Sequence, residues 1–301
     1  MKNIKTLLFL TLLLPTLAMA QQEYMITHYM FNGLSINPAY AGVHEGISAS
    51  LLWREQWVGF DGAPQTQMVS MHSPLADRSA SLGAVIYRDQ LGISKETGAY
   101  FSYAYRIHLN NDFKLSMGLQ ANTHNYLVDY SSASVPGFDD EGFGNSSQFL
   151  WNVGFGAMLH SERAYIGISV PQMMNRTLQI NDPDGQFTEL VRHYYLTAGY
   201  AFNLTHDLVL KPNVLVKAVE NAPVQVDLNA NVLIKSLIWA GVSYRSMDSL
   251  DGLLGIQINP NLMISYATDF TLTEVDAQSH EVMLNFIFGR SAKKIVTPRY
   301  F

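Results

Sequence analysis

An acidic, glycine-containing segment at 180–186, INDPDGQ, carries the residue types that bind Ca²⁺ in loop sites. If Gly185 takes the sixth position of such a loop, Ile180 and Val191 fall at the first and twelfth positions, where oxygen ligands are required. The spacing therefore favours a turn over a calcium site. The acidic run at 139–141, DDE, is typical of a solvated loop face. We expect no metal site in this chain.

Histidine, serine and cysteine are the other residue types that would support catalysis. Histidines at positions 72, 108, 160 and 193 fall in or beside predicted strands, and none belongs to a spaced metal motif. No GxSxG motif occurs, and spacing alone defines no Ser/His/acid set. Cysteine is absent, which excludes a disulfide framework, a thiolate metal site and a cysteine nucleophile. The sequence thus predicts no catalytic residue, no cofactor and no enzymatic activity.

The first twenty residues indicate export. Lys2 and Lys5 precede an apolar run at 7–14, and the small residues at 18–20, AMA, fit a cleavage site. We therefore expect residues 1–20 to be a signal peptide. Removing its two lysines leaves 17 basic residues (19 − 2) against 25 acidic ones, a net charge of −8. No basic patch suggests that the mature chain binds nucleic acid.

Composition and periodicity indicate how the elements of the mature chain are built. Hydrophobic residues make up 48% and charged residues only 15%, yet no apolar run long enough for a spanning helix follows the signal peptide. Apolar and polar residues alternate instead. In 101–109, FSYAYRIHL, the odd positions are apolar or aromatic, and the pattern repeats in 113–122, FKLSMGLQAN, after a polar turn. These segments predict a hairpin of two long strands.

Alternation recurs along the chain and predicts about fourteen strands. They lie at 47–57, 65–72, 81–88, 101–109, 113–122, 149–160, 164–170, 192–202, 208–218, 224–234, 237–245, 253–259, 262–269 and 281–288. A soluble β-sandwich would also alternate, but its strands average about 5–6 residues, whereas the clearest segments approach the length that crosses a bilayer. Their polar face carries Ser, Gly, Asn and Gln rather than many charges. We predict an all-β fold, a transmembrane antiparallel β-barrel in the outer membrane, in contact with the lipid bilayer.

The predicted connections differ in length. Those at 110–112, 161–163 and 235–236 are short, whereas those at 122–148 and 171–190 are the longest. Outer-membrane barrels have short periplasmic turns and longer outer loops. An even number of strands also brings both ends of the barrel to one side. Together these features predict periplasmic termini.

Four segments carry a resemblance to a known family. They are YMFNGLSINPAYAG at 29–42, LLWREQWVGFDGAPQT at 51–66, the following segment that ends in SPL, and KKIVTPRYF at 293–301. On these segments the chain resembles the PorP/SprF family of outer-membrane proteins, which are components or accessories of the type IX secretion system. The resemblance covers essentially the whole mature protein.

The resemblance implies a non-enzymatic role in type IX protein secretion. Such a barrel would bind and retain a secreted surface protein with a type IX C-terminal signal domain, for example an adhesin of gliding motility. It would otherwise link the outer membrane to the secretion motor through a periplasmic peptidoglycan-binding lipoprotein. The sequence leaves both roles open. A barrel that transports solutes or fatty acids is the alternative.

The chain divides into four parts on these grounds. Residues 1–20 form the signal peptide, 21–44 a periplasmic or lumenal segment, 45–290 the barrel, and 291–301 a C-terminal tail. We expect the tail to lie in the periplasm or to fold into the lumen, where it would touch an export component.

Nine residues of the first two motifs are candidates for a partner-binding or structural site. They are Asn37, Pro38, Tyr40, Gly42, Arg54, Gln56, Trp57, Gly62 and Pro64. The NPAYAG motif predicts a turn, because proline fixes φ and glycine permits close approach. Arg54 and Gln56 are expected near the lumen and Trp57 at the membrane interface, bonded to the loop at 62–64. These residues either plug the barrel and fix its register, or form a docking surface for a secreted partner.

Overall fold

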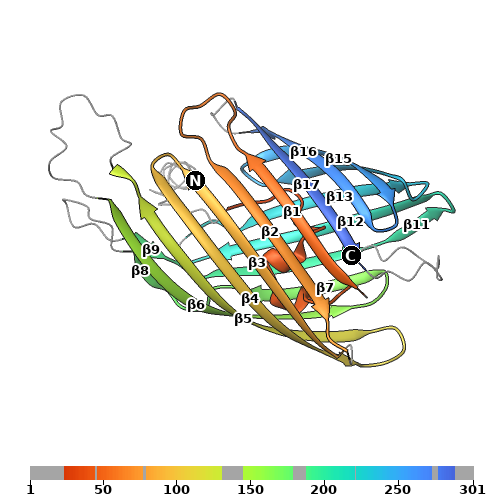
Figure 1. The fold of residues 1–301 in the computed structure, drawn as a ribbon. Helices are drawn as coiled ribbons and strands as arrows, with labels where there is room; N and C mark the ends of the chain where they lie inside the picture. The colour runs from red at the N-terminus through yellow and green to blue at the C-terminus, as the bar shows by residue number, and fades with distance from the viewer. Residues whose placement is uncertain are drawn as a thin grey trace, which may run out of the picture.

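The structure, a computed structural model, describes residues 24–44, 46–76, 79–130, 145–178, 188–220, 222–272 and 277–288. They form a closed antiparallel β-barrel with a short segment inside it (Figure 1). The predicted all-β barrel is confirmed. The predicted signal peptide, the tail at 291–301 and the acidic segments at 139–141 and 180–186 lie outside the described residues.

Fifteen strands form the wall. Their bounds are β1 Ile47–Glu55, β2 Gln65–Pro74, β3 Ala80–Leu91, β4 Ser94–His108, β5 Lys114–Val128, β6 Ser146–His160, β7 Ala164–Val170, β10 His193–Tyr200, β11 Phe202–Thr205, β12 Leu208–Val219, β13 Gln225–Ile234, β14 Ile238–Arg245, β15 Ser249–Asn259, β16 Leu262–Thr271 and β17 Gln278–Phe288. Only Ala201 separates β10 from β11, and both pair with β12, so they are two parts of one wall strand. The wall therefore has fourteen strands (15 − 1), the predicted number. The short strands β8 (Arg176–Leu178) and β9 (Thr188–Leu190) form a separate hairpin.

Neighbouring strands in the chain are neighbours in the wall. The first and last strands, β1 and β17, pair from Ile47↔Phe288 to Glu55↔His280, and we call this contact the seam. The pairing of β10 with β12 completes the ring. A closed ring leaves no strand edge unpaired along the hydrogen-bonded wall, as a membrane requires.

The two faces of the wall differ in chemistry. Outward side chains are apolar and exposed, and Phe101 and Leu119 are 58% and 63% exposed. Their inward neighbours Ser102 and Gln120 are polar and buried. This reverses the arrangement of a soluble sheet and suits a wall that lipid surrounds. No helix in the described part of the chain is long and apolar enough to cross a membrane.

Strands β4, β5 and β6 are longer than the sequence predicts. Each has 15 residues, and the predicted segment 101–109 covers only the second half of β4. The start of β4 contains Lys95, Glu96 and Thr97, which are polar on both faces. Alternation is lost there, because this part of the wall extends beyond the apolar band.

The two ends of the barrel carry different connections. The turn end, which holds Ile47 and Phe288, has the connections 75–79, 109–113, 161–163, 206–207, 235–237 and 260–261. The opposite end, which we call the loop end, has 56–64, 92–93, 129–145, 171–192, 220–224, 246–248 and 272–277. The longest connections lie at the loop end, as predicted, although 92–93 and 246–248 are tight turns. The assignment of the turn end to the periplasm stays a prediction.

Residues 24–44, which we call the plug, lie inside the ring of strands (Figure 1). They contain two 3₁₀ helices, η1 (Gly33–Ser35) and η2 (Pro38–Tyr40). Helix η2 begins where the Asn37 side chain accepts the Ala39 N–H at 2.9 Å, with Pro38 at the first helical position. Apolar plug residues pack with buried wall residues into the hydrophobic core.

The plug crosses the lumen along its length. The ring of Tyr24 packs on Tyr87 of β3, near the loop end, with 4.5 Å between ring centroids. At its other end Gly42 bonds to His72 of β2, near the turn end. The chain therefore runs from the loop end to the turn end before β1 begins. The described part of the predicted segment 21–44 thus lies in the lumen from Tyr24 to Gly42.

Candidate functional site

Thr27 and His28 attach the plug to the wall at the seam. Their main-chain N–H groups donate to the two carboxylate oxygens of Glu281 on β17, at 2.9 and 2.8 Å. The His28 ring Nδ1 lies 2.5 Å from the same carboxylate. Arg54 on β1 faces Glu281 across the seam at 3.2 Å and donates to Thr27 Oγ1 at 3.1 Å. We call these four residues the latch, because they join the plug to both strands of the seam.

Charged side chains continue around the lumen beside the latch. Arg54 also pairs with Asp269 on β16 at 2.6 Å. Arg245 on β14 lies 3.3 Å from Asp227 on β13 and 3.6 Å from Asp251 on β15. All five side chains are buried. Because a buried charge is costly without a partner, these strands are held in one arrangement by their opposite charges.

Gly42 fixes the other end of the plug. Its N–H donates to His72 Nδ1 at 3.1 Å, and its carbonyl accepts from Arg106 Nη2 at 2.5 Å. Its φ of +72° is in the left-handed region, and a Cβ would lie less than 3 Å from the Ser81 side chain. Only glycine meets both conditions here.

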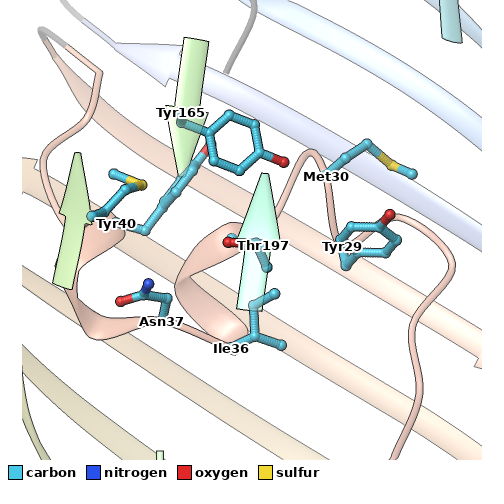
Figure 2. Close-up of a pocket in the computed structure, with 9 residues that line it drawn as sticks. Tyr29, Met30, Ile36, Asn37, Tyr40, Tyr165 and Thr197 are labelled. Atoms are coloured by element: carbon cyan, nitrogen blue, oxygen red, sulfur yellow. The ribbon is translucent and has the colours of Figure 1, made fainter. Parts of the chain in front are cut away.

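A small cavity lies between the plug and the wall (Figure 2). Plug residues that include Tyr29 and Tyr40 face Tyr165 of β7 and Thr197 of β10 there. The hydroxyl groups of Tyr29 and Tyr40 make no hydrogen bond within the described parts of the chain. Burial and the nearby charge of Asp227 raise the pKa of the Tyr29 hydroxyl, so it stays neutral.

The interior offers packing and polar contacts rather than a reactive set. The cavity is lined mainly by apolar and aromatic side chains. Over residues 24–288, where described, no three His, Asp or Glu side chains gather in a way that would hold a metal ion. The arrangement as a whole is suited to holding the plug in the lumen.

Four of the nine predicted site residues lie in the plug. Asn37, Pro38, Tyr40 and Gly42 are all buried. The Asn37 side-chain amide donates to main-chain carbonyls of β6 and β7 at 3.4 and 3.3 Å. The Tyr40 ring meets His72 edge to face, with 5.6 Å between centroids. The structure thus brings these four residues together with the wall.

Four others lie in the β1–β2 connection at the loop end, away from the first group. The Gln56 N–H donates to the Pro64 carbonyl at 2.9 Å, and the Gly92 N–H donates to the Gly62 carbonyl at 2.8 Å. Trp57 has a φ of +49°, and its N–H lies 3.4 Å from Ser279 Oγ. Main-chain bonds therefore shape this loop.

Arg54, the ninth residue, does not bond the 62–64 loop as expected. Its guanidinium points into the lumen and binds Asp269, Glu281 and the plug. The reason is electrostatic, since two buried carboxylates stabilise a buried guanidinium better than neutral loop carbonyls would. Arg54 thus belongs with the plug rather than with the loop.

Apart from Arg54, the charged residues in and beside the latch were not predicted from the sequence. Glu281, Asp269, Asp251, Asp227 and Arg245 each lie on the buried face of a wall strand near the loop end. A signal was present in the charged residue on the inward face of an alternating strand, which also occurs at Arg106, Lys211 and Lys217. Its recurrence on five adjacent strands would have indicated a charged belt.

Comparison with known proteins adds a family match. The family model described as type IX secretion system membrane protein PorP/SprF matches residues 18–286. No curated protein matches the sequence.

The fold is similar to solved transport barrels. The Ralstonia pickettii toluene transporter TbuX has a TM-score of 0.52 and 14% identity, over 86% of this chain and 93% of that chain. The monoaromatic hydrocarbon channel CymD has a TM-score of 0.51 and 13% identity, over 85% and 92%. A Pseudomonas aeruginosa FadL homologue has a TM-score of 0.50 and 12% identity, over 86% and 94%. At these identities the likeness concerns the fold alone.

Proposed function

Because this chain belongs to the PorP/SprF family of type IX secretion system membrane proteins, we propose that it binds and retains a secreted surface protein at the outer membrane. The partner is an adhesin-like protein that carries a type IX C-terminal signal domain. The observation that carries this proposal is the filled lumen, since residues 24–44 occupy the interior that a constantly open transport channel would need. A barrel whose lumen is filled at rest still presents its loop surfaces to a partner.

The β1–β2 connection at 56–64 is the described surface best suited to this role. Its main chain is held by bonds to two neighbouring segments, the 92–93 turn and the start of β17, where the Val58 N–H donates to the Gln278 carbonyl at 2.9 Å. Val58 and Phe60 are nevertheless 47% and 56% exposed. An ordered loop that presents apolar side chains loses little entropy when a partner covers it. This loop lies at the end predicted to face outward.

The alternative role is a link to periplasmic components. A peptidoglycan-binding lipoprotein and the secretion motor would meet the turn end, whose connection 109–113 exposes Leu109 and Phe113. The two roles therefore place the partner at opposite ends of the barrel. Paired variants at the two ends separate them.

Affinity purification from native membranes, with identification of what co-purifies, tests the proposal. We expect the Val58→Ser/Phe60→Ser variant to lose the secreted partner while its folded barrel stays in the membrane. The matched control, Leu109→Ser/Phe113→Ser, should retain that partner. Loss of a periplasmic component from the control alone would support the motor link instead. If no secretion protein co-purifies with the unaltered chain, the proposal fails.

A further inference from the structure

The plug and the wall behind it have opposite chemistry. Residues 24–44 contain no Asp, Glu, Lys or Arg. The buried wall side chains, in contrast, are largely polar, and they include Ser50, Ser70, Ser102, Ser116, Gln120, Asn122, Asn152, Asn213, Asn229, Asn231, Ser243, Ser265 and Asn285. Apolar wall residues such as Leu52 and Met283 also pack in the core with the plug, but polar side chains outnumber them. This lining is typical of a barrel interior that contacts water.

The plug is not one of the strands that close the ring. Wall side chains bond the plug main chain, for example Asn285 to the Phe31 carbonyl and Ser169 to the Ile36 carbonyl, but the plug adds no strand to the sheet. The ladder of the wall closes through the β1–β17 and β10–β12 pairings without it. Removing the plug would break no strand pairing, and Arg54 would keep Asp269 and Glu281 as partners.

We propose that residues 24–44 are a displaceable plug, and that the barrel without it is an aqueous passage for small hydrophilic solutes. The latch holds the closed state at the loop end. The plug is continuous with β1 at the turn end, so it leaves the lumen through that end. A fourteen-strand ring is larger than the eight-strand rings that side chains alone can fill.

Conductance across planar lipid bilayers tests the passage directly in potassium chloride solution. The unaltered mature chain should be closed for most of the recording. A variant that lacks residues 24–44 should conduct steadily once it is shown to be folded by its resistance to detergent at room temperature. A folded plug-less barrel that carries no current would overturn the proposal.

A second variant decides the matter if the plug-less chain does not fold. Thr27→Val/His28→Phe removes latch side chains from the plug and leaves the wall untouched. We expect about tenfold more open time, because hydrogen bonds to charged groups are among the stronger ones in proteins. Unchanged open time in this folded variant would contradict the latch and the proposal.

A cysteine lock shows that plug movement causes the opening. The chain has no cysteine, and a Cβ at Gly83 would lie 3.4 Å from the Ala41 Cβ, close to disulfide separation. It would also lie 3.0 Å from Leu34 Cδ1, so Gly83→Cys alone in the latch variant is the control for displacement of the plug by the new side chain. Ala41→Cys/Gly83→Cys added to the latch variant should close the passage on oxidation and reopen it on reduction. Conductance that persists after complete oxidation would contradict the proposal. These recordings need no secreted partner, so their outcome is independent of the retention test.

Discussion

Arg54 is the residue on which the plug and the seam most depend. Its side chain is buried and reaches Asp269 at 2.6 Å, Glu281 at 3.2 Å and Thr27 Oγ1 at 3.1 Å. It therefore joins strands β1, β16 and β17 to the plug. Loss of one member of such a buried set leaves the opposite charges without compensation.

Replacing Arg54 with methionine tests this role. We expect Arg54→Met to lower the free energy of unfolding by about 3–5 kcal/mol, because Glu281 and Asp269 lose their shared cation. Urea unfolding in detergent micelles measures the change. Glu55→Gln is the matched control. The Glu55 side chain follows Arg54 in the chain but is exposed, so this substitution should change stability by less than about 0.5 kcal/mol. Equal effects of the two variants would contradict the latch.

The sequence identifies Arg54 as a site residue but not its partners. Its motif stands out, because Arg and Trp are uncommon at the end of an alternating strand. Asp269 and Glu281, however, are 215 and 227 residues away along the chain. Only closure of the ring brings them to Arg54, and a single sequence gives no register between the first and last strands.

At the level of elements, the strands were predictable where one face meets lipid and the other meets the lumen. Alternation marks 164–170 and 224–234 almost to the residue. It fails at the start of β4, where both faces are polar, and in the plug, which has 3₁₀ turns and no sheet period. The NPAYAG motif predicts a turn, but its place against β5 and β6 follows from tertiary contacts.

Gly118 tests the contact between helix η2 and strand β5. A Cβ at this position would lie less than 3 Å from main-chain atoms of Pro38 and Ala39. We expect Gly118→Ala to displace η2, to make the plug cleavable by chymotrypsin at Tyr40, and to cost about 1–3 kcal/mol of stability. Gly252→Ala is the control, because its nearest neighbour lies 4.0 Å away. A plug that stays protected in Gly118→Ala would show that the wall tolerates the added methyl group.

At the level of the whole molecule, the architecture follows from one arrangement of surfaces. The composition, low in charge and rich in alternating apolar residues, predicts that apolar side chains face outward and polar ones inward. The structure has this arrangement along most of β1, β5 and β13. Whether the lumen is open or filled could not be predicted, because the polar wall is compatible with both water and a packed segment.

Site-directed spin labelling of β4 in lipid vesicles measures this arrangement most directly. Single cysteines at Phe101, Ser102, Tyr103 and Ala104 introduce labels into a chain that has no native thiol. We expect collisions with dissolved oxygen, which concentrates in the lipid, to be frequent at 101 and 103 and rare at 102 and 104. Equal collision rates at all four positions, or higher rates at 102 and 104, would contradict a lipid-facing apolar surface around a plugged polar interior.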